Sequence, residues 1–273
     1  MTNKLKALDL FSGVGGNSLA LFDMVETVAY CESDKHAAAV LLSRMEDGLL
    51  HNVPVFEDVC KLRGSDLPQV DIIIGGFPCQ DISIVGKGAG LEGARSGLFY
   101  EIMRLADEIG PKYIFLENVP SIQTRGLDRV LKELSQRRYH AVWCNLSAKD
   151  IGAPHKRKRW FLLAYSQSLG AGVDERWVRE VLEQGDLRSR GVQTGGNAGE
   201  TQSEFCGVSD GTSGDVVESL PAYLKADFWK DEEPPRLTRD KDQRAQRIKR
   251  LGNGVVPLQA RTAFLTLLGR MVI

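Results

Sequence analysis

Long apolar segments are absent from this 273-residue sequence, in which no stretch approaches the roughly 20 apolar residues that a membrane-spanning helix requires. The first residues also lack the apolar segment and small-residue cleavage site of a secretory signal. A charge excess is missing as well, because 35 basic residues face 36 acidic ones. We therefore expect no membrane partner, and any nucleic acid must be bound through a local basic patch.

Cysteine is scarce, and its spacing is not that of a metal site. None of the five cysteines belongs to a Cys-x-x-Cys pair, which predicts neither a disulfide framework nor bound metal. They are Cys31, Cys60, Cys79, Cys144 and Cys206. Unpaired thiols are typical of a reducing compartment, so we expect a cytoplasmic protein.

Short apolar runs alternate with helical patterns over the first 165 residues. Strands are expected at residues 5–11, 27–31, 53–56, 71–74, 113–116, 141–146 and 159–164. Helices are expected around residues 19–24 and at 34–45, 97–109 and 127–134. This alternation predicts an α/β fold, with an open, mostly parallel sheet and helices on both faces.

The composition changes after Tyr165, which predicts three parts. Residues 1–165 form the α/β domain. Residues 166–236 lose periodicity and are rich in Gly, Ser, Thr, Gln and Asn, which favours a small, loop-rich insert. Residues 237–273 are expected to hold a basic hinge and an amphipathic helix at 256–271 that returns to the first domain.

Acidic residues follow the second and third predicted strands, and glycines follow the first. Gly13 and Gly15 shape a strand-to-helix turn at which a ligand can approach the backbone. Glu32 can accept hydrogen bonds from two ribose hydroxyls, and Asp58 from an adenine amine. The turn alone also fits an ordinary strand–helix connection, and it departs from the dinucleotide spacing. Together with both acids, it predicts an adenosyl pocket.

Cys79 and Glu117 follow the next two strands and are expected to face the same crevice. A polar, glycine-rich loop around Cys79 favours a nucleophile over an inert buried thiol. Glu117 can donate a proton to a heterocyclic nitrogen if burial keeps it protonated, although an acid at a helix start is the simpler interpretation.

Two basic stretches border this predicted core. Arg157 and Arg159 would share one face of a strand, where they can meet phosphates or a substrate oxygen, although a charge run is more often a solvated face. A second basic stretch extends over residues 236–250. Two local patches on a nearly neutral chain are what a nucleic-acid groove requires.

The ordered set of motifs resembles the DNA cytosine-5 methyltransferase family. It comprises DLFSGVGG at 9–16, Glu32, EDV at 57–59, GGFPCQDIS at 75–83, ARSGLF at 94–99, ENV at 117–119, APHKRKRWFL at 153–162 and LGNGVVP at 251–257. The resemblance covers nearly all of the chain except 166–236, where the family carries its target recognition domain. It implies a Rossmann-like methyltransferase sheet that uses S-adenosyl-L-methionine.

The resemblance also implies a covalent mechanism on a cytosine flipped out of double-stranded DNA. Cys79 attacks carbon 6, Glu117 binds ring nitrogen 3 and the exocyclic amine, and carbon 5 then takes the methyl group. Arg157 and Arg159 match the family's basic pair near the flipped base. The implied cofactor contacts are Asp9, Phe11, Gly13, Gly15, Glu32, Asp58, Pro78, Leu98, Asn253 and Val255.

The family likeness carries further expectations. A compact monomer is expected, in a bacterial or phage-infected cell, either with a separately acting restriction endonuclease as a partner or as an orphan enzyme. Ser33 stands where relatives often have an aromatic residue, and His155 replaces the usual glutamine of the basic motif.

Three other functions have less support in the sequence. A tRNA cytosine-5 methyltransferase often carries a Cys-Phe-Thr motif in its recognition region, whereas Cys206 is followed by Gly207 and Val208. A catalytically inactive DNA-binding relative is disfavoured by the presence of both Cys79 and Glu117. A nucleotide oxidoreductase has no support in the glycine spacing.

Overall fold

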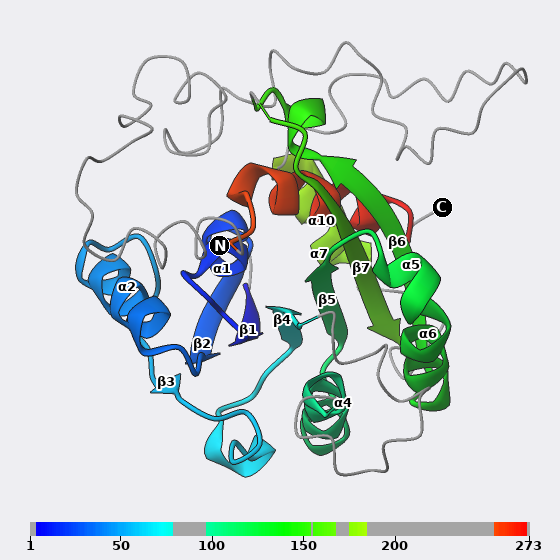
Figure 1. Ribbon diagram of the computed structural model, residues 1–273. Coiled ribbons are helices and arrows are strands. Elements are labelled where there is room, and N and C mark those ends of the chain that lie inside the picture. The colour runs from blue at the N-terminus through cyan, green and yellow to red at the C-terminus, as the bar shows by residue number, and fades with distance from the viewer. Residues whose placement is uncertain (1–3, 79–96, 154, 168–174, 185–253, 272–273) are drawn as a thin grey trace, which may run out of the picture.

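The computed structural model describes residues 4–78, 97–153, 155–167, 175–184 and 254–271. Within these ranges, seven strands form one mixed sheet in the order β3-β2-β1-β4-β5-β7-β6 (Figure 1). The strands are β1 (Leu5–Leu10), β2 (Val25–Cys31), β3 (Val55–Phe56), β4 (Ile72–Gly76), β5 (Tyr113–Asn118), β6 (Tyr139–Ser147) and β7 (Lys158–Ser166). Neighbours from β3 to β5 are parallel, and β7 runs antiparallel to β5 and β6. The predicted mostly parallel α/β sheet is confirmed.

Helices cover both faces of the sheet. They are α1 (Gly16–Ala20), α2 (Lys35–Glu46), α4 (Leu98–Ile109), α5 (Ile122–Arg125), α6 (Leu127–Gln136), α7 (Glu175–Gln184) and α10 (Pro257–Gly269), with two 3-10 helices, η1 (Gly64–Asp66) and η3 (Ala148–Ile151). The first helix is shorter than predicted, because a turn at 21–24 leads directly into β2. No helix in the described ranges has the length and apolarity needed to cross a membrane.

Alternation along the buried strands divides the core into two layers. Ile72 and Ile74 of β4 belong to the cluster that includes α7 and α10, whereas Ile73 faces the cluster around α4 and α6. Successive strand side chains point to opposite faces, so a continuous apolar run fits a strand with both faces covered.

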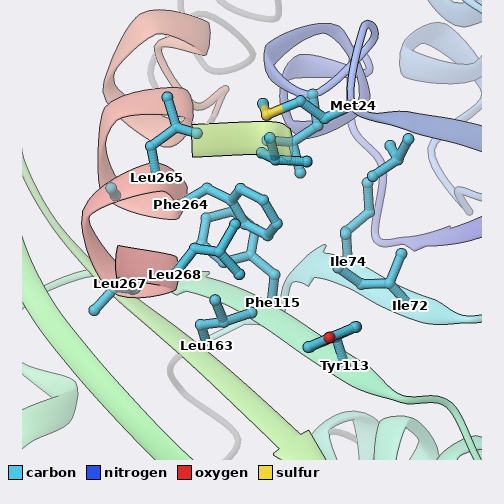
Figure 2. Packing of buried hydrophobic residues seen from close by; sticks show 14 of the residues in the cluster. Met24, Ile72, Ile74, Tyr113, Phe115, Leu163, Phe264, Leu265, Leu267 and Leu268 are labelled. Atoms are coloured by element: carbon cyan, nitrogen blue, oxygen red, sulfur yellow. The ribbon is translucent and has the colours of Figure 1, made fainter. Parts of the chain in front are cut away.

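The C-terminal helix α10 packs against the sheet beside α1, β6 and β7. Figure 2 shows Phe264 and Leu268 next to Phe115 of β5, and the rings of Phe115 and Phe264 meet edge to face at 5.1 Å. The sequence predicted an amphipathic helix here. That prediction is corrected, because nine of the thirteen residues are buried and include Gln259 and Arg261. Contacts on several sides, from α1, α7 and the β6–β7 hairpin, leave little of the helix in solvent.

Helix α7 lies inside the segment that was predicted to be a loop-rich insert. Its residues Trp177, Val178, Val181 and Leu182 are buried in the same cluster as α10. The Trp177 ring lies 5.3 Å from that of Tyr113 in β5. The core of the α/β domain therefore continues past the predicted boundary at residue 165, since this short segment does have a helical apolar stripe.

Candidate active site

A cleft of about 810 Å³ opens at the carboxyl ends of β1, β2, β3, β4 and β5, where open α/β sheets bind ligands. Seven of the residues predicted as cofactor contacts line it: Phe11, Gly13, Glu32, Asp58, Pro78, Leu98 and Val255. Glu117 lines the same cleft. Residues far apart in the sequence thus meet because parallel strands end at one edge of the sheet.

The glycine turn after β1 forms the floor of the cleft. Gly13 has a φ of +56°, which an L side chain rarely adopts, and no atom lies within 4 Å of the place where a Cβ would stand. Its backbone N–H donates to Glu32 Oε2 at 2.7 Å, and the Asp34 N–H donates to Glu32 Oε1 at 2.7 Å. The Glu32 carboxylate therefore holds the glycine turn against the start of α2.

A tight turn after β3 carries Asp58. The Asp58 carboxylate accepts a hydrogen bond from the Cys60 N–H at 3.0 Å and lies 3.6 Å from the Lys61 ammonium. The Asp58 side chain is 42% exposed, so its oxygens remain accessible from the cleft.

Glu117 stands at the end of β5 in a nearly closed environment. Its Oε1 forms an ion pair with Arg159 Nε at 2.7 Å. The side chain of Glu117 is 11% exposed and that of Arg159 is 14% exposed. Burial raises the pKa of Glu117, and the positive charges of Arg159 and Arg157 oppose this shift. Gly76 leaves room for the carboxylate, because a Cβ at that position would lie 2.7 Å from Glu117 Oε2.

Arg157 connects this pocket to the loop before α10. Its guanidinium donates to the carbonyl oxygen of Gly254, a residue that lines the cleft next to Val255. Burial lowers the pKa of Arg157, with the Arg159 charge acting in the same direction. Gln259 of α10 in turn donates to the carbonyl oxygens of Arg157 and Leu146 at 2.8 and 2.7 Å.

Two predicted cofactor contacts do not line the cleft. Asp9 is fully buried on the sheet face that α1 covers, and it accepts a hydrogen bond from Ser18 Oγ at 2.6 Å. Burial, opposed by that bond, raises the pKa of Asp9 to about 7. A Cβ on Gly15 would meet Leu50 and Leu41. Strand alternation and helix packing turn both positions away from the cleft, and their assignment as cofactor contacts stays a prediction.

Several predicted residues lie outside the described ranges. These are Cys79, Asn253, the basic stretch at 236–250 and most of the expected insert. Pro78, which directly precedes Cys79, does line the cleft.

Sequence reasoning missed other lining residues, among them Ser12, Asn17 and His36. Each stands within a few positions of a predicted contact: Ser12 in the loop after β1, Asn17 in the first turn of α1 and His36 in the first turn of α2. Such a position was the available signal, but it does not reveal which side chain turns inward.

Comparison with known proteins places this geometry in a family. The sequence model described as C-5 cytosine-specific DNA methylase matches residues 5–207. The chain belongs to the C-5 cytosine-specific DNA methylase family. Similarity to this family spans β1 to β7 and α7, and hence every strand that borders the cleft.

Curated relatives of this methylase family member are type II methyltransferases. M.CviJI of Paramecium bursaria Chlorella virus IL3A is 38% identical over 161 residues, which cover 58% of this chain and 42% of that protein. M.NgoBI of Neisseria gonorrhoeae is 35% identical over 169 residues, covering 60% and 51%. The chain thus matches about half the length of these relatives, or less.

Solved structures of methyltransferases share the fold. A protein described as a DNA modification methyltransferase encoded within an E. coli prophage is 28% identical, with a TM-score of 0.51 over 63% of this chain and 50% of that chain. The Dnmt2 methyltransferase of S. pombe is 23% identical, with a TM-score of 0.51 over 65% and 55%. The second likeness concerns the fold alone.

Proposed function

We propose that this protein transfers a methyl group from S-adenosyl-L-methionine to carbon 5 of a cytosine in double-stranded DNA. One observation carries the proposal: a single cleft holds both parts of the expected site. Gly13, Glu32 and Asp58 line it as the adenosyl part, and Glu117, which is paired with Arg159, lines it as well. Family membership and the type II methyltransferase relatives support it.

The side chains of the cleft fit an adenosyl group. Each carboxylate oxygen has two lone pairs, so Glu32 can accept from ribose hydroxyls while it retains its two backbone donors. Asp58 offers an exposed acceptor for an adenine amine, and Leu98 and Val255 provide apolar surface. When bound, this cofactor supplies a methyl group attached to a positively charged sulfur.

Cys79 acts as the nucleophile in this proposal. Its thiolate adds to carbon 6 of the flipped cytosine, which makes carbon 5 nucleophilic enough to form the new bond to the methyl carbon. The bond between that methyl group and sulfur would break in exchange, and its electron pair would stay on sulfur as a neutral thioether. A base then removes the carbon 5 proton, and the electron pair of that bond expels the thiolate. Carbon 5 gains one methyl group and loses one proton, and Cys79 is regenerated.

Glu117 stabilises the ring while the adduct exists. Because burial favours its protonated form, Glu117 can donate to ring nitrogen 3 as negative charge develops there. Arg159 holds the carboxyl group by its Nε contact, and Gly76 keeps the space beside it free.

Replacement of the nucleophile tests the function. Cys79→Ser should reduce transfer of a tritiated methyl group to DNA by at least about 10³-fold, because a hydroxyl is a much weaker nucleophile at neutral pH. Affinity for the cofactor, measured by calorimetry, should stay within about twofold. Duplex DNA that contains 5-fluorocytosine should form a denaturation-resistant complex with the wild type and none with the variant.

Cys144→Ala is the matched control, since the Cys144 thiol is buried in β6 outside the cleft lining. It should keep wild-type transfer. Methyl transfer to tRNA but not to DNA would replace the DNA proposal by the RNA alternative, and a Cys79→Ser variant with a substantial rate would remove Cys79 from the mechanism.

The remaining expectations about partners rest on the family resemblance. A restriction endonuclease that acts separately, a monomeric state and a cytoplasmic location stay predictions. Within residues 166–236, we propose that the part after α7 selects the target sequence, because methyl transfer itself requires only a cytosine and bases are distinguished by side chains at groove edges.

A further inference from the structure

An arginine of α4 grips the turn that carries Asp58. Arg104 Nη2 donates to the carbonyl oxygens of Val59 and Leu62, each at 2.9 Å. The other side of the guanidinium is held within α4, by Glu101 at 2.6 Å through Nε and by Glu108 at 2.6 Å through Nη1. Two carboxylates thus fix the fork that binds the turn.

The same helix contacts the turn at a second point. Glu108 Oε2 accepts a hydrogen bond from the Gly64 N–H at 2.7 Å. A Cβ on Gly64 would lie 2.9 Å from the Cβ of Glu108 and 3.1 Å from Ile109 Cγ1. The approach therefore depends on glycine at this position, because atoms so close to the helix backbone have little freedom to move.

The turn that Arg104 holds, Val59–Leu62, borders the cleft together with Asp58. Asp58 and Val59 both line the cleft, and the N–H groups of Lys61 and Leu62 donate to the Asp58 carbonyl at 3.1 Å. Leu98, the first residue of α4, lines the cleft as well. Helix α4 thus reaches the cleft at its own start through Leu98 and also holds the Asp58 turn through Arg104.

We propose that Arg104 is a positioning residue, which holds the Val59–Leu62 turn so that the Asp58 carboxylate meets the adenine amine of the cofactor. This inference rests on the proposed function, and Arg104 itself is absent from the residues that line the cleft. Lysine cannot replace it, because a single ammonium cannot reproduce four bonds in the planar geometry of the fork.

Binding of two nucleoside thioethers measures the position of Asp58 without any methyl transfer. S-adenosylhomocysteine carries the adenine amine, whereas S-inosylhomocysteine has a carbonyl oxygen that Asp58 would repel. Calorimetry on the full chain should show tighter binding of the adenine compound to the wild type. Arg104→Met and Arg104→Lys should lower the affinity for the adenine compound about tenfold and leave the affinity for the inosine compound nearly unchanged. The preference for adenine should therefore be lost.

Gly64→Ala is a second variant that keeps the arginine. It should push the turn away from α4 and reduce the adenine preference in the same direction, which keeps the proposal testable if the Arg104 variants fold poorly. Arg137→Met is the matched control. Arg137 also bridges two carboxylates, Asp107 and Glu133, with a similar exposure of 23% against 33% for Arg104, but it is absent from the cleft lining. Its adenine preference should equal that of the wild type.

The outcomes separate this inference from the function beneath it. If the wild type prefers adenine and the Arg104 and Gly64 variants keep that preference, the positioning role is wrong while the function stands. If the wild type binds both compounds equally, the assumed contact of Asp58 is wrong, and the inference falls with it. If the wild type binds neither compound, the proposed function fails as well.

Discussion

Asp9 carries a carboxyl group, which is usually charged, at a position that is fully buried from water. Ser18 Oγ donates to Asp9 Oδ2 at 2.6 Å, and Thr27 donates to Ser18 Oγ at 3.1 Å. Asp9 Oδ1 has no hydrogen-bond partner among the described residues. Desolvation outweighs the bond from Ser18 and raises the pKa to about 7, so the folded protein holds a proton on Asp9 at acidic pH.

This proton makes stability depend on pH. The folded state keeps it up to about pH 7, whereas an unfolded aspartate loses it near pH 4, so the free energy of unfolding falls as pH rises between these values. Asp9→Asn removes this contribution while retaining an oxygen for Ser18. Urea unfolding at several pH values should show a flatter profile between pH 4 and 7 for the variant.

Ser18→Ala provides the opposite comparison. It removes the hydrogen bond that lowers the pKa of Asp9, so the decline in stability should extend to higher pH than in the wild type. Identical slopes for the wild type and Asp9→Asn would show that Asp9 is ionised in the folded state throughout this range.

At the scale of elements, α10 ties the β6–β7 hairpin to the cleft. Gln259 is fully buried and donates from one amide group to carbonyl oxygens of β6 and of the segment before β7. Arg157 donates back to the loop before α10. Helix and hairpin therefore fix each other beside the pocket of Glu117.

Gln259→Met should destabilise the protein by about 1–3 kcal/mol, because a side chain of similar size replaces the donor and leaves buried carbonyl oxygens without it. Urea unfolding measures the loss. Thr262→Val is the control on the same helix. The Thr262 hydroxyl only adds a second hydrogen bond to the Leu258 carbonyl one turn earlier, so the loss of stability should stay below about 1 kcal/mol. Equal losses for the two variants would contradict the bridging role.

At the scale of the whole molecule, α7 extends the packed core of the α/β fold beyond residue 165. Its Trp177 packs against Tyr113 of β5 and, at 6.4 Å between rings, Phe264 of α10. An exchange of all residues from 166 to 236 would remove this contact. An exchange that begins after Gln184 would preserve it.

We expect a chimera that takes residues 185–236 from a relative of known target to stay folded and to methylate that relative's sequence. A chimera exchanged at 166–236, with alanine at the position of Trp177, should lose about 3–5 kcal/mol through the cavity left in the core. Bisulfite sequencing reads the target, and thermal unfolding reads the stability. An active 185–236 chimera that keeps the original target would place recognition elsewhere in the chain.

Local patterns predicted most of the described elements, because burial on one or both sides of a strand leaves a periodic record in the sequence. They also predicted an adenosyl pocket with Glu32 and Asp58 and placed Glu117 at a neighbouring strand end. The structure joins all three in one cleft, because parallel strands end at one edge. The α7 stripe was missed because its short helix stands among residues of low periodicity. The burial of Asp9 was not predicted, because its motif gives its position in the chain and not the face of the sheet on which it lies.

The sequence by itself determined which polar residues reach the strand ends, because alternation and turn chemistry act over a few neighbouring positions. Only the tertiary structure decided which of them touch. Strand β7 inserts between β5 and β6, pairs Asn118 with Trp160, and so brings Arg159 beside Glu117. The grip of Arg104 on the Asp58 turn likewise depends on how α4 packs. Such contacts join segments that carry no local signal of each other, so they follow from packing and not from pattern.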